Sequence, residues 1–349
     1  MTTKTRIALV GLGRMGKNHL RVLRDTPGFE LAGVVEPRGD APSDLGSIPF
    51  VRSVAELAKV PFDAAVIATP TATHQAMALE LIGMGKHLLV EKPIASSYEE
   101  GRQVLAAAHA KGTKLAVGHV ERFNPAVRKL REIIKEGWIG TPIHFSFTRV
   151  GGYPETLLSG NNVILDLAVH DIDVLRSLVG AVKLEHSMCH VTWKENVFDT
   201  AEMFLATGTG ASASVHVNWI TPTKIRSIRI TGTRGVCFVD YILQTCELFG
   251  GSLLKQVEPN IASFDKLEEL YRTTDRIQFG VRKEEPLRAQ ALQFRRFLEN
   301  DESGELCTGS DALSAVLIAE RAIAFERGRQ KPTVAPKSSS LPAATDDWV

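Results

Sequence analysis

Short apolar runs alternate with helical patterns along the first third of the chain, and this alternation constrains the fold more than any other feature. The apolar runs predict strands at residues 6–10, 30–36, 64–68, 87–90 and 115–118. The intervening patterns predict helices at 15–24, 53–59, 73–83 and 98–111. Strands and helices in this order build βαβ units, in which helices cover both faces of a parallel sheet.

The texture of the sequence changes after about residue 121. Helical patterns occur at 125–136, 163–179, 287–298 and 312–327, and strand-like runs at 143–150, 184–193, 200–206, 211–219, 224–231 and 236–243. The run ASASVHVNW alternates small or polar residues with apolar ones, which is typical of an antiparallel sheet with one covered face. The sequence therefore predicts an α/β, doubly wound domain over 1–121 and an α+β domain with an open, mainly antiparallel sheet over 122–334. Residues 335–349, rich in Pro, Ser and Ala, are expected to form a flexible tail.

Composition excludes several classes of protein. A length of 349 residues suffices for two domains, and a formal charge of +1 gives no net attraction to nucleic acid or to an anionic membrane. No run approaches the roughly 18 apolar residues of a membrane span. The four cysteines are widely spaced, and the histidines and acids show no metal-ligand spacing, so no metal is expected. We expect a cytoplasmic protein.

A glycine motif, Gly11-Leu-Gly13-Arg-Met-Gly16, joins the first predicted strand to the first predicted helix. Glycines at this spacing allow a tight turn, a close approach of the backbone to a pyrophosphate, and close packing of helix on strand. Glu36 follows Gly16 by 20 residues and is placed to bind ribose hydroxyls. The motif predicts a Rossmann dinucleotide-binding domain, with NAD favoured over NADP because Glu36 repels a 2′-phosphate. Arg38, close by, leaves NADP open.

Four further motifs follow in order: ATPTATH at 68–74, EKP at 91–93, GHVERFNP at 118–125 and DLAVHDID at 166–173. Together with the glycine motif, this set resembles the glucose–fructose oxidoreductase/inositol dehydrogenase (Gfo/Idh/MocA) family. The resemblance implies a nicotinamide-dependent dehydrogenase whose site lies between two domains. It also implies that the open sheet contributes to a homodimer or homotetramer.

The resemblance implies roles for individual residues. The active-site lysine corresponds to Lys92, and the acid–base pair to Asp166 and His170. The residues expected to bind the cofactor are Gly11, Gly13, Arg14, Met15, Gly16, Glu36, Thr69, Pro70, His74, Glu91, Lys92 and His119.

The chemistry of these residue types agrees with that mapping. Oxidation of an alcohol needs a base for the hydroxyl proton, and histidine titrates near neutral pH. Asp166 and His170 lie four residues apart, so on an α-helix they share a face, where Asp166 would orient the imidazole. Lys92 would stabilise negative charge on the reacting oxygen. Each residue also has an ordinary alternative, such as a surface ion pair or a turn lysine, and Asp171 and Asp173 are expected to be structural.

Within the family, GHVERFNPAV and NNVILDLAVHDID are most similar to members that oxidise the C3 hydroxyl of UDP-N-acetylglucosamine. Such a product is a substrate for a pyridoxal-phosphate-dependent 3-aminotransferase, in surface glycan or lipid A biosynthesis. The substrate-binding candidates, besides the catalytic three, are Arg122, Asn124, Arg149, Tyr153 and Asn162. The arginines are proposed for the diphosphate. Asn161 and Asn162 depart from the glycines common in the family at this point.

Two alternatives remain open at this stage. A dehydrogenase of a free polyol or sugar, such as an inositol, would need no diphosphate site. A non-catalytic NAD sensor or scaffold would have lost its chemistry, and the presence of Lys92, Asp166 and His170 argues against it.

Overall fold

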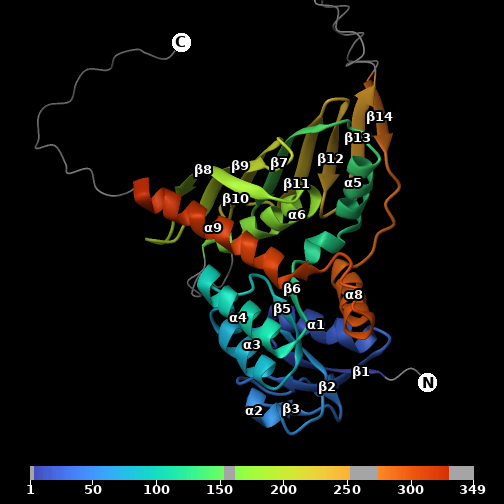
Figure 1. Cartoon of the computed structure of the whole chain (residues 1–349), viewed down its shortest axis with the longest axis vertical. Helices are drawn as coiled ribbons and strands as arrows, with labels where there is room; N and C mark the ends of the chain where they lie inside the picture. Colours follow the sequence, from blue (N-terminus) through green and yellow to red (C-terminus); the bar gives the residue numbers. More distant parts are fainter. Residues whose placement is uncertain (1–3, 153–161, 252–273, 330–349) are drawn as a thin grey trace, which may run out of the picture.

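The computed structural model describes residues 4–152, 162–251 and 274–329. Two sheets organise these residues, one in each half of the molecule (Figure 1). The predicted fold class is confirmed: the first sheet is a doubly wound Rossmann sheet, parallel except for one edge strand, and the second is mainly antiparallel. No described helix is both long enough and apolar enough to span a membrane.

The first sheet has the strand order β15-β6-β5-β4-β1-β2-β3. Its strands are β1 (Thr5–Val10), β2 (Phe29–Val35), β3 (Phe50–Val51), β4 (Ala64–Ile67), β5 (His87–Glu91), β6 (Leu115–Gly118) and β15 (Cys307–Thr308). The helices around it are α1 (Arg14–Asp25), α2 (Val54–Leu57), α3 (His74–Gly83), α4 (Tyr98–Lys111) and α8 (Pro286–Asn300). The strand order reverses between β1 and β4, where nucleotides bind in folds of this kind.

Alternate residues of β1 belong to two different cores. Ile7 and Leu9 pack with residues of α1 and α8, whereas Ala8 and Val10 pack with residues of α2, α3 and α4. Both faces of the first sheet are therefore covered, which explains why its strands are apolar at successive positions rather than at alternate ones.

The chain returns to the first sheet near its end. β15 pairs antiparallel with β6, with Cys307 opposite Val117, and α8 packs against α1. Residues 307–308, which were expected in the second domain, therefore complete the first sheet.

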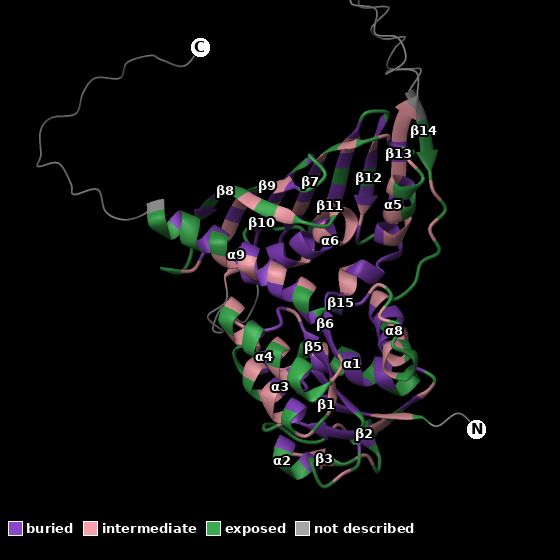
Figure 2. Cartoon of the chain, in the orientation of Figure 1, coloured by how far each residue is buried: buried purple, intermediate pink, exposed green. Residues whose placement is uncertain are grey.

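The second sheet has the strand order β14-β13-β12-β11-β7-β10-β9-β8, and only the β10–β7 pair is parallel. Its strands are β7 (Pro142–Val150), β8 (Val182–His190), β9 (Thr200–Thr207), β10 (Ser212–Asn218), β11 (Ile225–Gly232), β12 (Gly235–Asp240), β13 (Thr245–Gly251) and β14 (Thr274–Gln278). The helices α5 (Pro125–Lys135), α6 (Val169–Val179) and α9 (Gly309–Arg329) lie along one face (Figure 1). Burial alternates along β9 and β10, so one face is a core face and the other is not (Figure 2).

The helix predicted over 163–179 is not uniform. Its first part, Ile164–Ala168, is a π-helical turn (η5), and α6 continues from Val169. Short π segments inside α-helices are rare and are frequent at functional sites. This turn carries Asp166, one of the expected catalytic residues.

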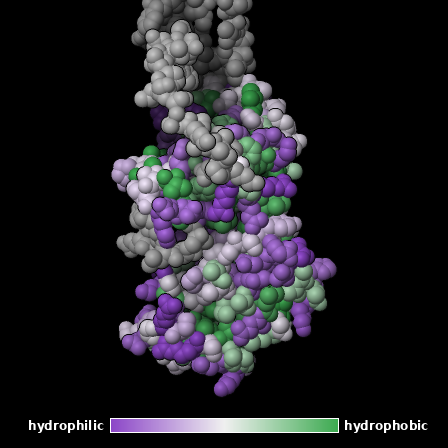
Figure 3. Space-filling view, turned by 90° about the vertical axis from the view of Figure 1, so that its left-hand side faces the viewer, coloured by the Kyte–Doolittle hydropathy of each residue, from purple (hydrophilic) through white to green (hydrophobic). Residues whose placement is uncertain are grey.

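Along the side of the molecule that carries α3, α4 and the end of α9, hydrophobic and hydrophilic residues are interspersed (Figure 3). The expected tail at 335–349 lies outside the described residues.

Candidate active site

The glycine loop has the geometry that a dinucleotide site requires. Gly11 has φ +98°, and a Cβ there would lie 2.6 Å from the carbonyl oxygen of Ala68. A Cβ on Gly16 would lie 2.1 Å from the carbonyl oxygen of Gly11. Gly13 is different, because a Cβ there would meet no atom within 4 Å. Gly11 and Gly16 are therefore needed by the fold itself, while Gly13 faces open space at the start of α1, where a phosphate can approach the free N–H groups. The exposed Arg14 and the half-buried Met15 follow at the same end of the helix.

Glu36 directly follows β2 and reaches back to the same loop. Its Oε2 accepts a hydrogen bond from the Leu12 N–H at 2.7 Å, and its Oε1 accepts one from the Arg38 N–H at 3.1 Å. Each carboxylate oxygen can accept a second hydrogen bond, so ribose hydroxyls still have acceptors here. The carboxylate is held in place by backbone groups before any ligand binds.

Two loops at the carboxyl ends of β4 and β5 are tied together by His74. The Nε2 of His74 lies 2.9 Å from the Thr69 carbonyl oxygen, and its Nδ1 lies 2.8 Å from that of Pro93. The side chain is buried, whereas Thr69 is half-buried and Pro70 is exposed. Of these expected cofactor residues, Thr69 and Pro70 have accessible surface, and His74 acts by positioning their loop.

Glu91, at the end of β5, is also buried. Its Oε1 lies 2.7 Å from the Nε2 of His19 on α1, and its Oε2 accepts the Lys92 N–H at 3.2 Å. The pKa of its carboxyl is lowered: burial alone would raise it, but the His19 side chain and the Lys92 charge outweigh burial. Glu91 thus links the dinucleotide-binding helix to the loop of Lys92.

The two halves of the molecule meet at Lys92. Its Nζ donates to the Asp166 carbonyl oxygen at 2.8 Å and to the Asp166 Oδ1 at 3.1 Å. The Trp219 Nε1–H, just after β10, donates to the Asp166 Oδ2 at 3.1 Å. Burial alone would raise the pKa of the Asp166 carboxyl, but Lys92 and Trp219 lower it by more. The net shift of this pKa is therefore downward. Asp166 is therefore a charged partner of Lys92.

This geometry corrects the role expected for Asp166. Its carboxylate oxygens accept from Lys92 and Trp219, and the part of the chain that the structure describes shows no hydrogen bond between Asp166 and His170. The reason is the π-helical turn, because the shared face of residues four apart holds for a regular α-helix.

His170 is half-buried beside this pair. Its Nδ1 is buried and has no hydrogen-bond partner among the described residues. Burial and the nearby charges of Lys92 and Arg149 hold the pKa of its imidazole well below the usual value. The ring of His119 lies 6.3 Å from that of His170, centroid to centroid. His119, expected at the cofactor, is only 2% exposed and so offers little surface to one.

The two arginines expected to bind a diphosphate are engaged elsewhere. Arg122 forms a two-pronged ion pair with Asp173, at 2.6 and 2.8 Å, and reaches Asp311 at 3.2 Å. Arg149, 1% exposed, is paired with Asp171 and with Glu121 at 2.9 Å. These placements contradict the expectation, which rested on their position beside the motifs.

The remaining polar candidates serve mainly as helix caps. Asn124 accepts the Ala126 N–H at 3.1 Å at the start of α5, and it donates to the Tyr241 carbonyl oxygen at 3.0 Å. Asn162 accepts the Ile164 and Leu165 N–H groups at the start of the π turn. Tyr153 lies outside the described residues.

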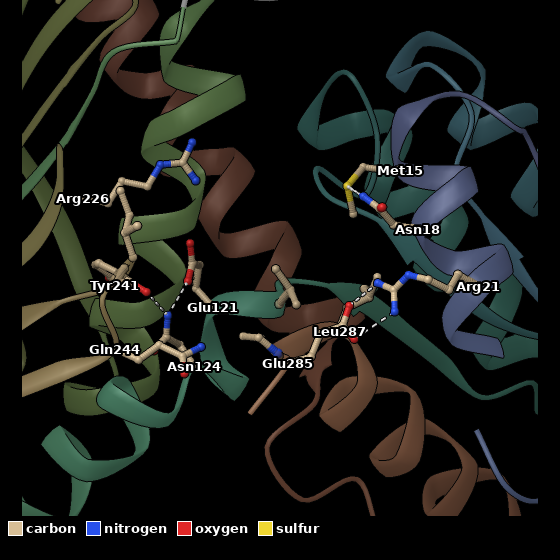
Figure 4. Close-up of a pocket in the computed structure, with 13 residues that line it drawn as sticks. Met15, Asn18, Arg21, Glu121, Asn124, Arg226, Tyr241, Gln244, Glu285 and Leu287 are labelled. Atoms are coloured by element: carbon tan, nitrogen blue, oxygen red, sulfur yellow. Dashed lines mark hydrogen bonds and ion pairs between the residues drawn. The ribbon is translucent and has the colours of Figure 1, made fainter. Parts of the chain in front are cut away.

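Three residues of the site were missed by sequence reasoning. His19 and Trp219 touch the expected residues Glu91 and Asp166, and Arg226 lines a cavity between the two halves of the molecule (Figure 4). All three come from outside the family motifs. Exposed and buried residues alternate along 225–230, and this alternation places Arg226 on the covered face of its sheet. It is the sequence signal that could have pointed to Arg226.

Comparisons with known proteins agree with the geometry. Residues 5–119 match the family described as "Oxidoreductase family, NAD-binding Rossmann fold", and residues 127–237 match the "GFO/IDH/MocA C-terminal domain". The chain is 31% identical over 257 residues to scyllo-inositol 2-dehydrogenase (NAD(+)) of Bacillus subtilis, covering 68% of this chain and 75% of that protein. It is 28% identical over 248 residues to UDP-N-acetylglucosamine 3-dehydrogenase of Acidithiobacillus ferrooxidans, covering 70% and 76%.

Solved structures share the whole fold. The structure of the Acidithiobacillus ferrooxidans UDP-N-acetylglucosamine 3-dehydrogenase matches with a TM-score of 0.78 at 22% identity, covering 94% of this chain and 99% of that one. A levoglucosan dehydrogenase in complex with NADH matches with a TM-score of 0.80 at 18% identity, covering 93% and 98%.

The fold and the cleft between its two sheets define a dehydrogenase, and its cofactor is NAD. The open space above Gly13 and the prearranged Glu36 carboxylate fit that cofactor. The chain belongs to the GFO/IDH/MocA oxidoreductase family.

Proposed function

We propose that this protein oxidises a ring hydroxyl of a nucleotide-linked sugar, and that the C3 hydroxyl of UDP-N-acetylglucosamine is its target. The observation that carries the dehydrogenase chemistry is the Lys92–Asp166 pair beside His170, at the carboxyl end of β5. NAD, when bound, supplies the acceptor for the hydride that leaves the carbon.

The proton of the hydroxyl goes to His170. The neutral imidazole is the form that can accept a proton, and the lowered pKa of His170 favours that form in the resting protein. The Lys92 ammonium donates a hydrogen bond to the reacting oxygen and stabilises the negative charge that develops there. The Asp166 carboxylate binds the Lys92 ammonium, and the Trp219 N–H holds that carboxylate in place. Together they position Lys92.

The relative that acts on UDP-N-acetylglucosamine supports the choice of substrate, because the alignment covers 76% of its length. A 3-keto sugar is chemically suited to amination by a pyridoxal-phosphate-dependent aminotransferase. We propose that step as the next reaction, in surface glycan or lipid A biosynthesis.

A free polyol such as an inositol is the second candidate substrate. Two observations favour it: the similarity to scyllo-inositol 2-dehydrogenase, and the engagement of Arg122 and Arg149 in buried ion pairs. A polyol needs the hydroxyl chemistry of Lys92 and His170 but no diphosphate site.

We also propose that the protein is a homodimer or homotetramer that assembles through the uncovered face of the second sheet. Phe204 on β9 and Phe238 on β12 lie on that face with 50% and 43% of their surface exposed. Burial of such side chains against a second copy is favourable. Light scattering after size exclusion tests this, and a monomer at micromolar concentration would contradict it.

The function is tested by identifying the product. The protein is incubated with NAD, UDP-N-acetylglucosamine, a 3-aminotransferase and glutamate, and the nucleotide sugar is analysed by mass spectrometry and NMR. We expect a 3-amino sugar, because only a ketone at C3 is converted by that aminotransferase. If UDP-N-acetylglucosamine stays unchanged and scyllo-inositol is oxidised rapidly, the substrate is a free polyol and not a nucleotide-linked sugar.

A further inference from the structure

A cavity of about 380 Å³ lies between the two halves of the molecule, close to the glycine loop. Met15 and Asn18 line it from α1, and Glu121 and Asn124 from the segment before α5. Arg226 lines it from β11 and Tyr241 from the turn after β12 (Figure 4). Its volume falls within the range of small-molecule sites, roughly 300–1,000 Å³. The cavity is therefore large enough for part of a substrate that extends beyond the reacting sugar.

Arg226, on β11, differs from the other arginines near the site. Its guanidinium makes no hydrogen bond or ion pair with any described residue, and its Nε is buried without a partner. Arg122 and Arg149, in contrast, are each bound to two carboxylates. A buried donor without a partner costs free energy, and a ligand that accepts from it recovers that cost.

The carboxylates close to Arg226 already have other partners. Glu121 accepts from Arg149, and Asp171 accepts from Arg149 and from the Tyr241 hydroxyl. Asp166 accepts from Lys92 and Trp219. Among the described residues, none therefore accepts a hydrogen bond from Arg226, and its donors are available to a ligand.

Arg226 is also electrostatically close to the catalytic residues. Its charge interacts with that of Asp166, and it is one of the charges that lower the pKa of His170. A ligand that spans from His170 to Arg226 would therefore have its reacting hydroxyl at one end and an anionic group further along.

We propose that Arg226 binds the diphosphate of the nucleotide-linked sugar in the cavity between α1 and β11. This inference rests on the proposed function, and it assigns to Arg226 the role that Arg122 and Arg149 do not fill. The planar guanidinium presents N–H donors in a fork that matches two phosphate oxygens, and a charge-assisted pair of this kind is stronger than a neutral hydrogen bond.

The experiment measures UDP binding by calorimetry and steady-state kinetics in the wild type and three variants, Arg226→Met, Arg226→Lys and Arg288→Met. Methionine keeps an unbranched stem of similar length, so loss of charge is tested with little loss of packing. Lysine restores the charge without the fork. Arg288, an exposed arginine of α8 that does not line the cavity, is the matched control. NAD affinity in each variant verifies that the fold is intact.

We expect Arg226→Met to weaken UDP binding roughly 10- to 100-fold and to raise KM for UDP-N-acetylglucosamine by a similar factor, with a much smaller change in kcat. Arg226→Lys should lie between, and Arg288→Met should match the wild type. Equal UDP affinity in the wild type and Arg226→Met would overturn the assignment, as would a wild type that binds no UDP.

The outcomes also separate this inference from the proposed function. If UDP-N-acetylglucosamine is oxidised equally well with and without Arg226, the proposed function stands and the role of Arg226 is wrong. UDP binding that depends on Arg226, without oxidation of UDP-N-acetylglucosamine, would keep the residue and reject that sugar as substrate.

Discussion

The two sheets of this protein differ in how many of their faces the chain covers. In the first sheet, β4 is buried at all of its residues and β1 at its last four, since helices pack on both sides. In the second sheet, β9 alternates strictly between core and outer positions, because α5, α6 and α9 cover one face only (Figure 2). The difference follows from topology: βαβ crossovers place helices on both faces, while antiparallel neighbours need no helix between them.

The same difference divides the active site. The first sheet contributes loops at the ends of its strands, which carry Lys92 and the residues expected to bind the dinucleotide. The second sheet contributes the segment packed on its covered face, with Asp166 and His170. The hydrogen bonds from Lys92 to Asp166 join the two contributions.

The largest expected effect on kcat comes from replacing His170, which the second half of the molecule contributes to the site. His170→Asn should lower kcat roughly 100- to 10,000-fold, the usual loss when a general base is removed. The matched control is His190→Asn, the same substitution at an exposed position of β8, which should leave kcat unchanged. Near-normal turnover of a folded His170→Asn protein would remove His170 as the base.

The contribution of the first half is tested by Lys92→Met. We expect kcat to fall roughly 100- to 1,000-fold, because a charged donor to the reacting oxygen is lost. NAD affinity should change much less. Lys111→Met, at the exposed end of α4, is the control. A loss of NAD affinity as large as the loss of kcat would mean that Lys92 acts mainly on the cofactor.

Neighbouring residues of β9 sharpen the comparison of faces. Met203 is completely buried and Phe204 is half exposed. Met203→Ala should lower the free energy of unfolding by about 2–5 kcal/mol, and Phe204→Ala by less than about 0.5 kcal/mol in the monomer. Urea denaturation at low protein concentration measures both. Equal losses would show that the second sheet is covered on both faces.

The glycine loop offers a similar contrast within the first half. Gly16→Ala would press its Cβ on the Gly11 carbonyl and should destabilise the fold by about 1–3 kcal/mol. Gly13→Ala should leave the melting temperature unchanged and weaken NAD binding, since its Cβ would project into open space. Thermal denaturation with and without NAD separates the loss of stability from the loss of NAD binding. Normal NAD affinity of the Gly13→Ala protein would show that the pyrophosphate does not bind at Gly13.

The smallest effect expected is on the pH dependence. A neutral His170 is required, and its pKa is lowered by burial and by the charges of Lys92, Arg149 and Arg226. The kcat/KM of the wild type should therefore stay level as the pH falls through 6.5 and decline only below it. Arg226→Met should move this acid limb to higher pH by a fraction of a unit, since one repelling charge is gone. An acid limb centred above pH 6.5 in the wild type would contradict the lowered pKa.

Sequence patterns predicted most strands of the first sheet, because these strands are continuous apolar runs. The glycine motif also marks where the first strand ends and the first helix begins. They missed β13 and β14, which lie at the edge of the second sheet and lack a clear alternation of apolar residues. They also missed β3 and the return of β15 in the first sheet, since two residues are too few to form a pattern.

The motifs supplied the candidate catalytic residues, but not the residues that these candidates contact. Asp166 was expected to face His170 because an α-helix was assumed, and the π turn changes which neighbours meet. Arg122 and Arg149 were expected to bind a diphosphate because they lie beside the motifs. Their ion-pair partners, 51 and 22 residues away in the sequence, could not be recognised from it. Arg226 was missed because it lies outside the motifs, although the alternation of exposed and buried residues along 225–230 places it on the covered face of its sheet.

The most direct test of the central claim follows NADH absorbance when NAD and UDP-N-acetylglucosamine are added to the wild type and to Lys92→Met, with scyllo-inositol as the parallel substrate. We predict NADH formation by the wild type with the nucleotide sugar, and a rate at least roughly 100-fold lower in the variant. A wild type that binds NAD but forms no NADH with either compound, or a variant as active as the wild type, would contradict the account.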